Sequence, residues 1–236
     1  MRLLLTGSNG FIGKYFINNY QNKHNIKTFS FLNDDINNLE MANAEVVFHL
    51  SALVHQMGGA TKEEYEKVNV TQTLDLAKKV KASGVKHFIF MSTVKVYGEE
   101  TDISYTENSV CNPQDEYGKS KLQAEQELQK LEDDNFKVSI IRTPIVYGYD
   151  VKANIKSLIN LIKKVPVLPF GKIENRRSMV FIGNLCHLID EIIIQEKAGI
   201  FLASDDEPLS TSRLIELIAN GLDKKVYLIK IPFFES

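Results

Sequence analysis

The sequence is poor in the features that mark several common classes of protein. Its 236 residues include no tryptophan and only two cysteines. Cys111 and Cys186 lie far apart, and neither has a histidine spaced to complete a metal-ligand set, so we expect reduced thiols and no metal site. The 28 basic and 30 acidic residues give a formal charge of -2. Because there is no positive excess, nucleic acid is not an expected partner.

Long apolar runs are also missing. No segment approaches the roughly 20 apolar residues of a membrane-spanning helix, so we expect no membrane span. The first residues, MRLLLTGSNG, contain a short apolar run that glycine and polar residues interrupt too early for a secretion signal. We interpret this segment as a first strand and expect a cytoplasmic protein.

Short β-rich segments alternate with longer helical patterns in the first part of the chain. Such alternation is typical of parallel βαβ units. The expected strands cover 3–5, 26–31, 46–50, 87–91 and 138–141, and the expected helices cover 11–20, 62–81 and 117–131. This order predicts an α/β fold with a doubly wound parallel sheet.

The pattern changes after Gly148. Apolar residues recur at i, i+3, i+4 and i+7 in two segments, which predicts amphipathic helices there. These helices are centred on 155–162 and 185–192, with a turn-rich loop expected at 165–178 between them. A closing unit is predicted to contain a strand at 200–203, a helix at 211–220 and a strand at 226–229.

These segments suggest two domains. We predict a main domain of residues 1–148, with 179–199 packing back on it. The remaining segments, 149–178 and 200–236, are expected to form a small lobe.

The first strand runs into the glycine-rich turn TGSNGFIG. In a strand-turn-helix context, Gly7 permits a tight turn, Gly10 allows close approach of a pyrophosphate, and Gly13 lets helix and strand pack closely. The helix N-terminus adds free N–H groups for the phosphates. A plain strand-to-helix turn is the alternative, but the position of the motif favours a dinucleotide. The residues expected to bind it here are Gly7, Asn9, Gly10, Phe11, Ile12 and Gly13.

An acidic segment, Asn33-Asp34-Asp35-Ile36, follows the second strand and contains no arginine. Asp34 or Asp35 could accept hydrogen bonds from the adenosine end of the cofactor. An Asx turn or a helix cap at Asp35 explains the same residues equally well. The choice between NAD and NADP therefore stays open.

Three residues form a candidate catalytic set. Tyr117 and Lys121 are four positions apart on one face of a predicted helix. A phenol has a pKa near 10, and we expect a fixed ammonium and an oxidised nicotinamide to lower it. Thr93 ends a central strand, where open α/β sheets place ligands. Taken singly, the helical pair could be an ordinary solvated face, and Ser92 and Thr93 a strand-end cap.

Together these motifs resemble the extended short-chain dehydrogenase/reductase family, in particular its nucleotide-sugar epimerases and reductases. TGSNGFIG matches the family's TGxxGFIG turn, YGKSK its YxxxK pair, and STVKVYG its Ser/Thr strand end. The resemblance implies a Rossmann domain with a small C-terminal substrate-binding lobe, and NAD or NADP as cofactor. It also implies catalysis by Thr93, Tyr117 and Lys121. Tyr117 would be the acid/base, and Lys121 would also hold the nicotinamide ribose.

Further matches extend the implied site. Asn69 matches the family's NVxGT helix, with a structural or proton-relay role. Leu50, Ser51 and Ala52 match a turn over the cofactor, and the preceding His49 is interpreted as a core residue. Asp35-Ile36 resembles an element at the adenine. Arg142 resembles a structural arginine, whereas Asn154 and Arg177 match positions that hold the nucleotide diphosphate of a UDP-sugar; adjacent Arg176 is expected to be a solvated charge.

A finer resemblance concerns bacterial surface-polysaccharide enzymes. It favours 4-keto reduction of a UDP-2-acetamido-2,6-dideoxy-4-hexulose. The alternatives are a UDP-sugar 4-epimerase with tightly bound NAD and a non-catalytic NAD(P)-sensing regulator. A 4,6-dehydratase is not expected, because Val94 and Lys95 stand where dehydratases of the family carry Asp-Glu. A homodimer is left open.

Overall fold

The computed structural model describes residues 1–41, 43–54, 60–101, 103–151 and 153–230. Its contacts divide the chain into two compact units. The larger unit comprises Met1–Pro144 and Gly183–Ala203, and the smaller unit comprises Ile145–Ile182 and Ser204–Ser236.

The larger unit is built on a parallel sheet that has six strands among the described residues, in the order β2-β1-β3-β4-β5-β9. This confirms the predicted α/β fold class. Strands β3 to β5 are buried along nearly their whole length, as expected where both faces of a parallel sheet are covered. The strands are β1 (Arg2–Thr6), β2 (Asn25–Phe29), β3 (Val46–His49), β4 (His87–Thr93), β5 (Lys137–Thr143) and β9 (Gly199–Leu202).

Strand β9 differs from the prediction. Residues 200–203 were predicted to belong to the small lobe, but β9 pairs in parallel with β5, from Ser139–Gly199 to Arg142–Leu202. This pairing satisfies the backbone groups at the edge of β5 and buries part of its own short apolar run. The strand itself was predictable from the sequence, whereas its partner was not.

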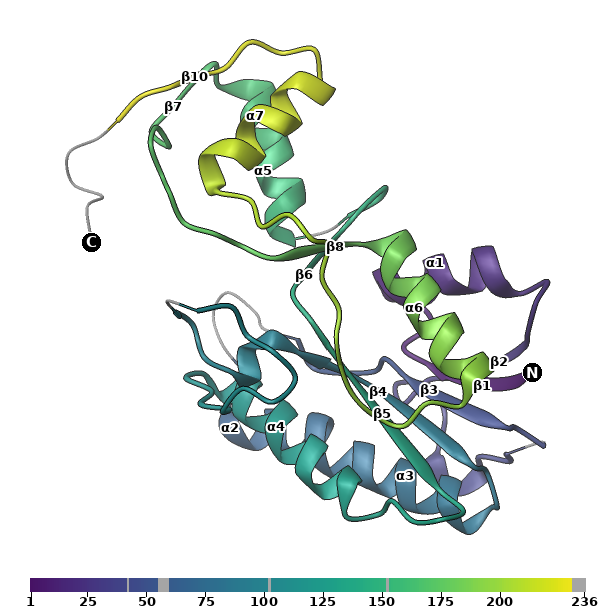
Figure 1. The fold of residues 1–236 in the computed structure, drawn as a ribbon. Coiled ribbons are helices and arrows are strands. Elements are labelled where there is room, and N and C mark those ends of the chain that lie inside the picture. Colours follow the sequence, from purple (N-terminus) through teal and green to yellow (C-terminus); the bar gives the residue numbers. More distant parts are fainter. Residues whose placement is uncertain (42, 55–59, 102, 152, 231–236) are drawn as a thin grey trace. The chain divides into compact units, whose positions relative to one another are not determined.

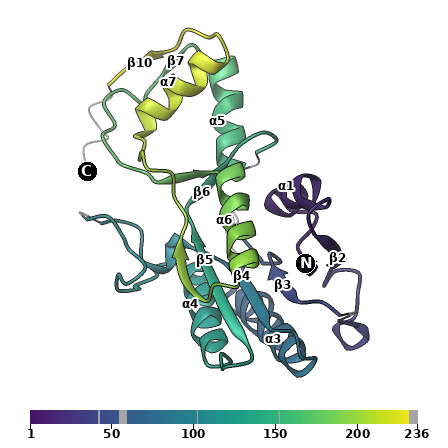
Figure 2. The ribbon, with the colours of Figure 1, turned by 45° about the vertical axis from the view of Figure 1, so that its right-hand side comes forward.

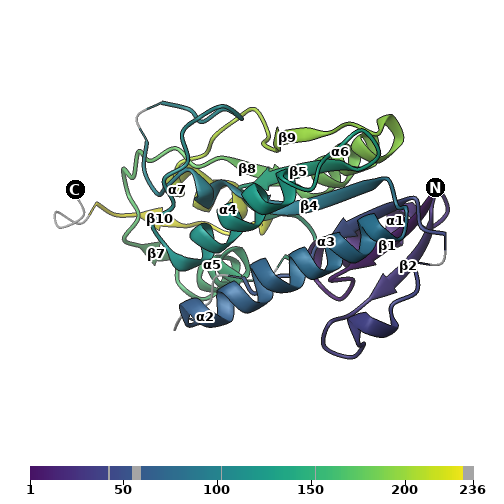
Figure 3. The same cartoon turned by 90° about the horizontal axis from the view of Figure 1, so that it is seen from below.

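Helices cover both faces of this sheet. Figures 1 and 3 show α1 (Phe11–Tyr20) and α6 (Ile182–Gln195) on one face, and α3 (Gln72–Ala82) and α4 (Glu116–Gln129) on the other. Alternate strand residues face the two layers. The core under α3 and α4 contains Leu4, Val47, Leu76, Val80, Phe88, Phe90, Ala124, Leu128, Val138 and Ile140, all nearly inaccessible to solvent.

The strand order reverses between β1 and β3, which places their carboxyl ends side by side at a topological switch point. The connection from β2 to β3 contains only the short 3-10 turn η1 (Ile36–Asn38). This segment offers no room for a further strand and helix. The switch point therefore lies between the second and third strands counted from the β2 edge, beside the glycine-rich turn.

The helix predicted at 62–81 is not uniform. It begins as α2 (Lys62–Tyr65), continues as the π-helical segment η2 (Glu66–Thr71) and ends as α3. A capping box starts it: Thr61 Oγ1 accepts from the N–H of Glu64 at 3.2 Å, and the Glu64 carboxylate accepts from the N–H of Thr61 at 2.7 Å. Single π-turns in helices are frequent at functional sites.

The smaller unit packs α5 and α7 together, as Figure 2 shows, over the buried side chains of Ile162, Leu168, Ile215 and Ala219. Its described residues also form two parallel two-stranded ribbons. The segment 165–178 was predicted as a loop, yet it contains β7, because a two-residue strand leaves no periodicity to detect. The elements are β6 (Ile145–Tyr147), α5 (Ala153–Lys164), β7 (Val167–Leu168), β8 (Met179–Phe181), α7 (Thr211–Gly221) and β10 (Tyr227–Leu228).

None of the helices in the described part of the chain combines the length and the apolar character needed to cross a bilayer.

Candidate active site

The glycine-rich turn forms a cradle that side chains would fill. Gly7 has φ of +70°, and a Cβ there would lie 2.8 Å from the Leu50 carbonyl carbon and the Ser51 nitrogen. A Cβ on Gly13 would lie 2.6 Å from the Gly7 carbonyl oxygen. Helix α1 starts at its N-cap Gly10 without a side-chain cap, so N–H groups of its first turn are available to an anion. These features fit a dinucleotide pyrophosphate.

A buried hydrogen-bonded cluster supports this cradle. Thr6 Oγ1 accepts from the N–H groups of Leu50 and Ser51, each at 3.2 Å. Since both its lone pairs are used, its proton goes to His49 Nδ1 at 2.7 Å, which leaves the His49 Nε2 proton for Thr73 Oγ1 at 3.0 Å. Burial lowers the pKa of His49 to about 3, with a smaller contribution from the Lys121 charge. His49 is thus a neutral core histidine, as predicted.

Asn69 connects the segment after β3 to α4, the helix that carries the candidate residues Tyr117 and Lys121. It lies on the π-helical segment and is fully buried. Its amide accepts from the Leu53 N–H at 2.8 Å and donates to the Leu53 carbonyl and to Ser120 Oγ, both at 3.0 Å. Ser120 Oγ in turn donates to the Tyr117 carbonyl at 2.8 Å. Asn69 therefore orients the first turn of α4, which agrees with the predicted supporting role.

The three candidate catalytic residues come together at the carboxyl end of β4. Thr93 ends that strand and is 8 % exposed, and its side chain is close enough to that of Tyr117, in the first turn of α4, to influence the pKa of the phenol. One turn later, Lys121 is 2 % exposed, and its Nζ lies 3.9 Å from the centroid of the Phe90 ring. Tyr65 flanks Tyr117, with the ring centroids 6.1 Å apart.

Burial dominates the protonation of this set. The pKa of Tyr117 is raised to about 12, mainly by burial and also by the charge of Asp115 and by the neighbouring Tyr65, while the interaction with Thr93 opposes the rise. Burial also lowers the pKa of Lys121 to about 7, against the attraction of Glu125. We predicted that Lys121 and an oxidised nicotinamide together lower the pKa of Tyr117. In the protein alone, desolvation of the phenol raises that pKa instead, and the lowering in the cofactor complex stays a prediction.

Lys95 takes part in a local ion-pair network beside Thr93. Thr93 Oγ1 accepts from the Lys95 N–H at 3.3 Å, and Lys95 Nζ lies 2.7 Å from Asp115 Oδ2 and 2.6 Å from Glu99 Oε1. Partial burial would lower the pKa of Lys95, but the two carboxylates outweigh it and hold that pKa above its usual value. Lys95 is therefore a cation at neutral pH and is not available as a base.

A charged cluster lies under α4, the helix that carries Tyr117 and Lys121. Glu125 on α4 is 1 % exposed and accepts from Ser92 Oγ, from Arg142 Nη2 at 2.6 Å and from Arg142 Nε at 3.2 Å. The Arg142 guanidinium also lies 4.7 Å from the centroid of the Tyr97 ring. Although burial opposes it, the ion pair with Glu125 raises the pKa of Arg142. The predicted structural role of Arg142 is consistent with these contacts.

Asp35 acts as a cap in this structure. It is the N-cap of η1, and its Oδ1 accepts from the backbone N–H of Asn37 at 2.9 Å and from the Asn37 side chain at 3.0 Å. The cap alternative is thus confirmed. The cap leaves Oδ2 of Asp35 for other contacts, so the adenine role of Asp35 and Ile36 stays a prediction.

The predicted diphosphate ligands belong to the smaller unit. Arg177 is exposed, and its backbone forms an antiparallel bridge with Leu209 through two hydrogen bonds of 2.9 Å. Asn154 lies in the first turn of α5. Arg176 is exposed as expected. The bridge holds the Arg177 backbone while its guanidinium stays accessible to an anion.

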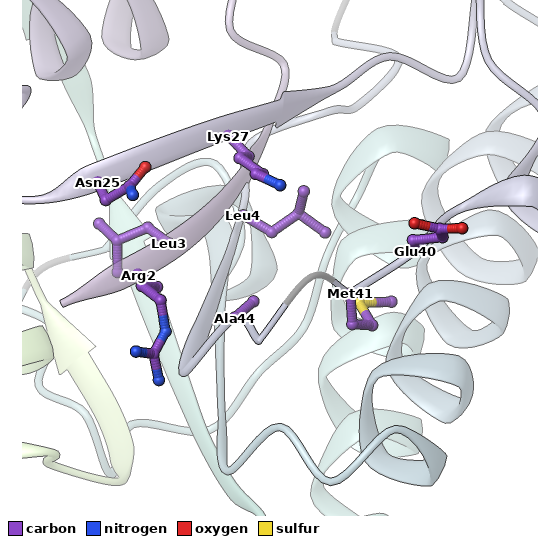
Figure 4. A pocket seen from close by; sticks show the side chains of 8 residues that line it. All are labelled: Arg2, Leu3, Leu4, Asn25, Lys27, Glu40, Met41 and Ala44. Atoms are coloured by element: carbon purple, nitrogen blue, oxygen red, sulfur yellow. The ribbon is translucent and has the colours of Figure 1, made fainter.

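Two other features of the larger unit do not form sites. One is a cavity of about 30 Å³ between β1, β2 and the loop before β3. Figure 4 shows the side chains that line it, including Arg2, Leu4 and Met41. It is large enough only for about one water molecule. On α6, ligand atoms of His187, Asp190 and Glu191 lie within 4.8 Å of one another.

The side chains of Lys23 and His24 already occupy the Asp190 carboxylate. Its two oxygens lie 2.5 Å from Lys23 Nζ and 2.7 Å from His24 Nε2. This group on α6 therefore braces the turn after α1 rather than presenting a carboxylate to a metal ion.

Sequence reasoning missed several residues that build the site: Tyr65, Asp115, Ser120 and Glu125. For Asp115 a signal was available, because an aspartate just before a helix is a favoured N-cap. Asp115 Oδ1 does accept from the Gly118 N–H at 2.6 Å. Tyr65, Ser120 and Glu125 each contact a residue that is distant in the sequence, and no local sequence pattern predicts such contacts.

Comparisons with known proteins agree with this geometry. The model of the NAD dependent epimerase/dehydratase family matches residues 3–201. The chain is similar to a UDP-glucose 4-epimerase of Vibrio cholerae, with 37% identity over 98% of this chain and 79% of the relative. It is 26% identical to an Escherichia coli O157:H7 N-acetyl-alpha-D-glucosaminyl-diphospho-ditrans,octacis-undecaprenol 4-epimerase, over 98% of this chain and 75% of the relative.

Solved structures share the fold. A dTDP-4-dehydrorhamnose reductase of Bacillus anthracis, in complex with NADP, has a TM-score of 0.86 at 21% identity, over 98% of this chain and 84% of that one. A UDP-glucuronic acid 4-epimerase of Bacillus cereus, in complex with NAD, has a TM-score of 0.84 at 21% identity, over 98% and 87%. The motif resemblance is thereby confirmed, and the chain belongs to the NAD-dependent epimerase/dehydratase family of nucleotide-sugar enzymes.

Proposed function

We propose that this protein exchanges hydride at C4 of a UDP-sugar with a bound nicotinamide cofactor, and that it acts as a 4-epimerase. The chemistry is supported by one observation, the pair of hydroxyl groups on Thr93 and Tyr117, which lies near Lys121 at the carboxyl ends of the strands. The glycine cradle lies at the same end of the sheet. The preference for epimerase comes from the 37% identity with the Vibrio cholerae UDP-glucose 4-epimerase.

In this mechanism Tyr117 transfers the proton of the sugar hydroxyl, and Thr93 hydrogen-bonds to the same oxygen. When bound, the cofactor supplies the hydride acceptor and donor, and in its oxidised form a positive charge. Such a charge favours the phenolate and opposes the burial that raises the pKa of Tyr117. Lys121 holds the nicotinamide ribose and adds its own charge when protonated.

Water elimination is not part of the proposal. A 4,6-dehydratase needs an acid for the C6 hydroxyl and a base for the C5 proton beside the catalytic threonine. Val94 has no proton to give, and Lys95 is held as an ammonium by Asp115 and Glu99.

A second candidate is 4-keto reduction of a UDP-2-acetamido-2,6-dideoxy-4-hexulose with external NAD(P)H. The surface-polysaccharide resemblance of the sequence supports it, and reductases are among the proteins of the same fold. A non-catalytic NAD(P) sensor is disfavoured, because such a protein has no use for a buried Tyr-Lys pair.

One experiment separates these activities. The purified protein is incubated with UDP-glucose or UDP-GlcNAc and catalytic NAD, and the products are followed by NMR. An epimerase yields the 4-epimer with no net change in NADH. Stoichiometric NAD(P)H oxidation with a supplied UDP-4-keto sugar, and no epimer, would establish the reductase instead. Loss of water from UDP-GlcNAc at enzyme-like rates would overturn both.

The acid/base assignment has its own test. Tyr117→Phe should reduce kcat by about 10²- to 10⁴-fold while cofactor affinity stays near normal, because only the transferable proton is lost. Lys121→Met should impair both kcat and cofactor binding. A Tyr117→Phe variant that keeps most of its activity contradicts the assignment, and unchanged cofactor binding in Lys121→Met removes the ribose contact.

Substrate binding is proposed to involve Asn154 and Arg177, which would hold the diphosphate. Arg177→Ala should weaken UDP binding by about 10- to 100-fold, the loss of a charge-assisted contact. Its matched control is the neighbouring exposed Arg176→Ala, for which no loss is expected. Equal UDP affinities for both variants in calorimetric titration would return Arg177 to the solvated surface.

The remaining cofactor contacts, Asp35, Ile36, Leu50, Ser51 and Ala52, go with this proposal, as do a cytoplasmic location and a homodimer. The cofactor is NAD or NADP. Titrating the protein with each, and measuring its mass in solution, tests these predictions.

A further inference from the structure

Lys95 links two segments that meet at Tyr117. It belongs to the 3-10 turn η3 (Val94–Val96) directly after Thr93, while Asp115 precedes α4. Lys95 Nζ lies 2.7 Å from Asp115 Oδ2, and both side chains are largely buried, with 30% and 25% exposed. The Lys95 carbonyl packs against the helix start, because a Cβ on Gly118 would lie 2.8 Å from its oxygen.

Asp115 has two tasks that conflict. Its Oδ1 accepts from the Gly118 N–H at 2.6 Å and caps the catalytic helix, so its carboxylate stabilises that helix end. The same negative charge stands two residues before Tyr117 and disfavours a phenolate there. Removing Asp115 would therefore relieve the charge but lose the cap.

We propose that Lys95 is a positioning residue for Tyr117: its ammonium holds the Asp115 carboxylate in the helix cap and offsets the charge that this carboxylate places beside the phenol. This proposal rests on the proposed role of Tyr117 as the proton-transfer group. Lys95 cannot serve as the base of an elimination. The proposal gives it a role in hydride exchange instead.

A test of this proposal must account for every charged or titratable group around Tyr117 that acts on its pKa. Asp115 lies at its own helix start and Tyr65 faces it from α2, and both raise its pKa. Lys121 lies one turn along α4, and Glu99 is the second partner of Lys95. Lys95 contacts Asp115 directly through an ion pair.

The experiment measures the pKa of the Tyr117 phenol directly and does not depend on enzymatic turnover. Protein labelled with ¹³Cζ-tyrosine and saturated with NAD is titrated by NMR, and the Tyr117 signal is identified by its loss in Tyr117→Phe. Lys95→Met should raise the pKa of Tyr117 by roughly 0.5 to 1, whereas Lys95→Arg, which keeps the charge, should leave it near the wild-type value. Lys119→Met is the matched control: it removes a lysine charge from the helix that carries Tyr117, but from an exposed pair with Glu116.

A double-mutant cycle tests whether Lys95 acts on Tyr117 through Asp115. In an Asp115→Asn background, Lys95→Met should change the pKa of Tyr117 much less than in wild type, because the charge it offsets is gone. In the epimerase assay, Lys95→Met should move the rising limb of the kcat/KM pH profile to higher pH by the same amount and leave the high-pH plateau.

Three results would overturn the proposal: an unchanged pKa in Lys95→Met, an equal change in both backgrounds, or an equal change in Lys119→Met. If Lys95→Met raises the pKa of Tyr117 as expected but the protein has neither epimerase nor reductase activity, the proposed function is refuted. The link between Lys95, Asp115 and Tyr117 then still stands.

Discussion

Two buried polar clusters support the two halves of the candidate site, and they differ in charge. Under the glycine cradle, Thr6, His49 and Thr73 form a chain of neutral hydrogen bonds. Under the catalytic helix, Glu125 and Arg142 form an ion pair with side chains 1% and 4% exposed. The first cluster holds a turn to the adjacent strand end, while the second joins β4, β5 and α4.

This difference in charge predicts how much stability is lost when a residue of either cluster is substituted. A neutral cluster that loses a member leaves one donor or acceptor unpaired, at a cost of about 1 to 3 kcal/mol. A buried ion pair that loses one partner leaves a full charge without compensation, at about 3 to 5 kcal/mol. The helix that carries Tyr117 and Lys121 therefore depends on the less tolerant cluster.

The largest effect is expected from breaking the charged cluster. Glu125→Gln should lower the free energy of unfolding by about 3 to 5 kcal/mol, because Arg142 then stays buried without a counter-charge. Thermal denaturation should show a Tm lower by roughly 10 °C. The control is Glu116→Gln on the same helix, whose pair with Lys119 is exposed. Equal Tm values for the two variants would show that the ion pair is not structurally critical.

A smaller effect is expected from the neutral cluster. His49→Leu should cost about 1 to 3 kcal/mol in urea unfolding, because the buried hydroxyl of Thr6 loses its acceptor. The cost should be the same at pH 6 and pH 8, since the pKa of His49 is lowered to about 3 and the ring is neutral at both values. The exposed His187→Leu on α6 serves as control. A cost that changes between the two pH values would mean that His49 carries charge.

The most pH-dependent effect concerns Lys121, which interacts with His49 of the first cluster and Glu125 of the second. Its pKa is about 7 when folded and near 10.4 when unfolded, so between these values the unfolded chain holds a proton that the folded chain lacks. Wild-type stability should therefore rise through this window, on the order of 1 kcal/mol per pH unit. Below pH 7 the cost of the buried charge is fully present.

Lys121→Met removes that cost. The variant should be more stable than wild type at pH 6, and its advantage should shrink as the pH rises from 7 towards 10.4, measured by urea unfolding at each pH. A difference that stays constant with pH would contradict the buried, easily discharged ammonium. A gain in stability together with a loss of cofactor binding is expected of a functional residue.

Much of the fold and of the site could be predicted because it depends on local rules. The glycines at 7, 10 and 13 are required by backbone contacts within a few residues, and helix α1 was predicted with its observed bounds. Tyr117 and Lys121 share a helix face because the helical repeat places i and i+4 together. The alternation of strands and helices was enough to predict a doubly wound parallel sheet.

The tertiary structure alone decided what depends on burial and on distant partners. It paired β9 with β5, linked Asn69 to Ser120 across 51 residues and brought Glu125 to Ser92 and Arg142. It also set the charges: a tyrosine, a lysine and a histidine of ordinary pKa in the sequence acquire values of about 12, 7 and 3. Desolvation has no local sequence pattern, since it is the packing of the whole unit that removes water from a side chain.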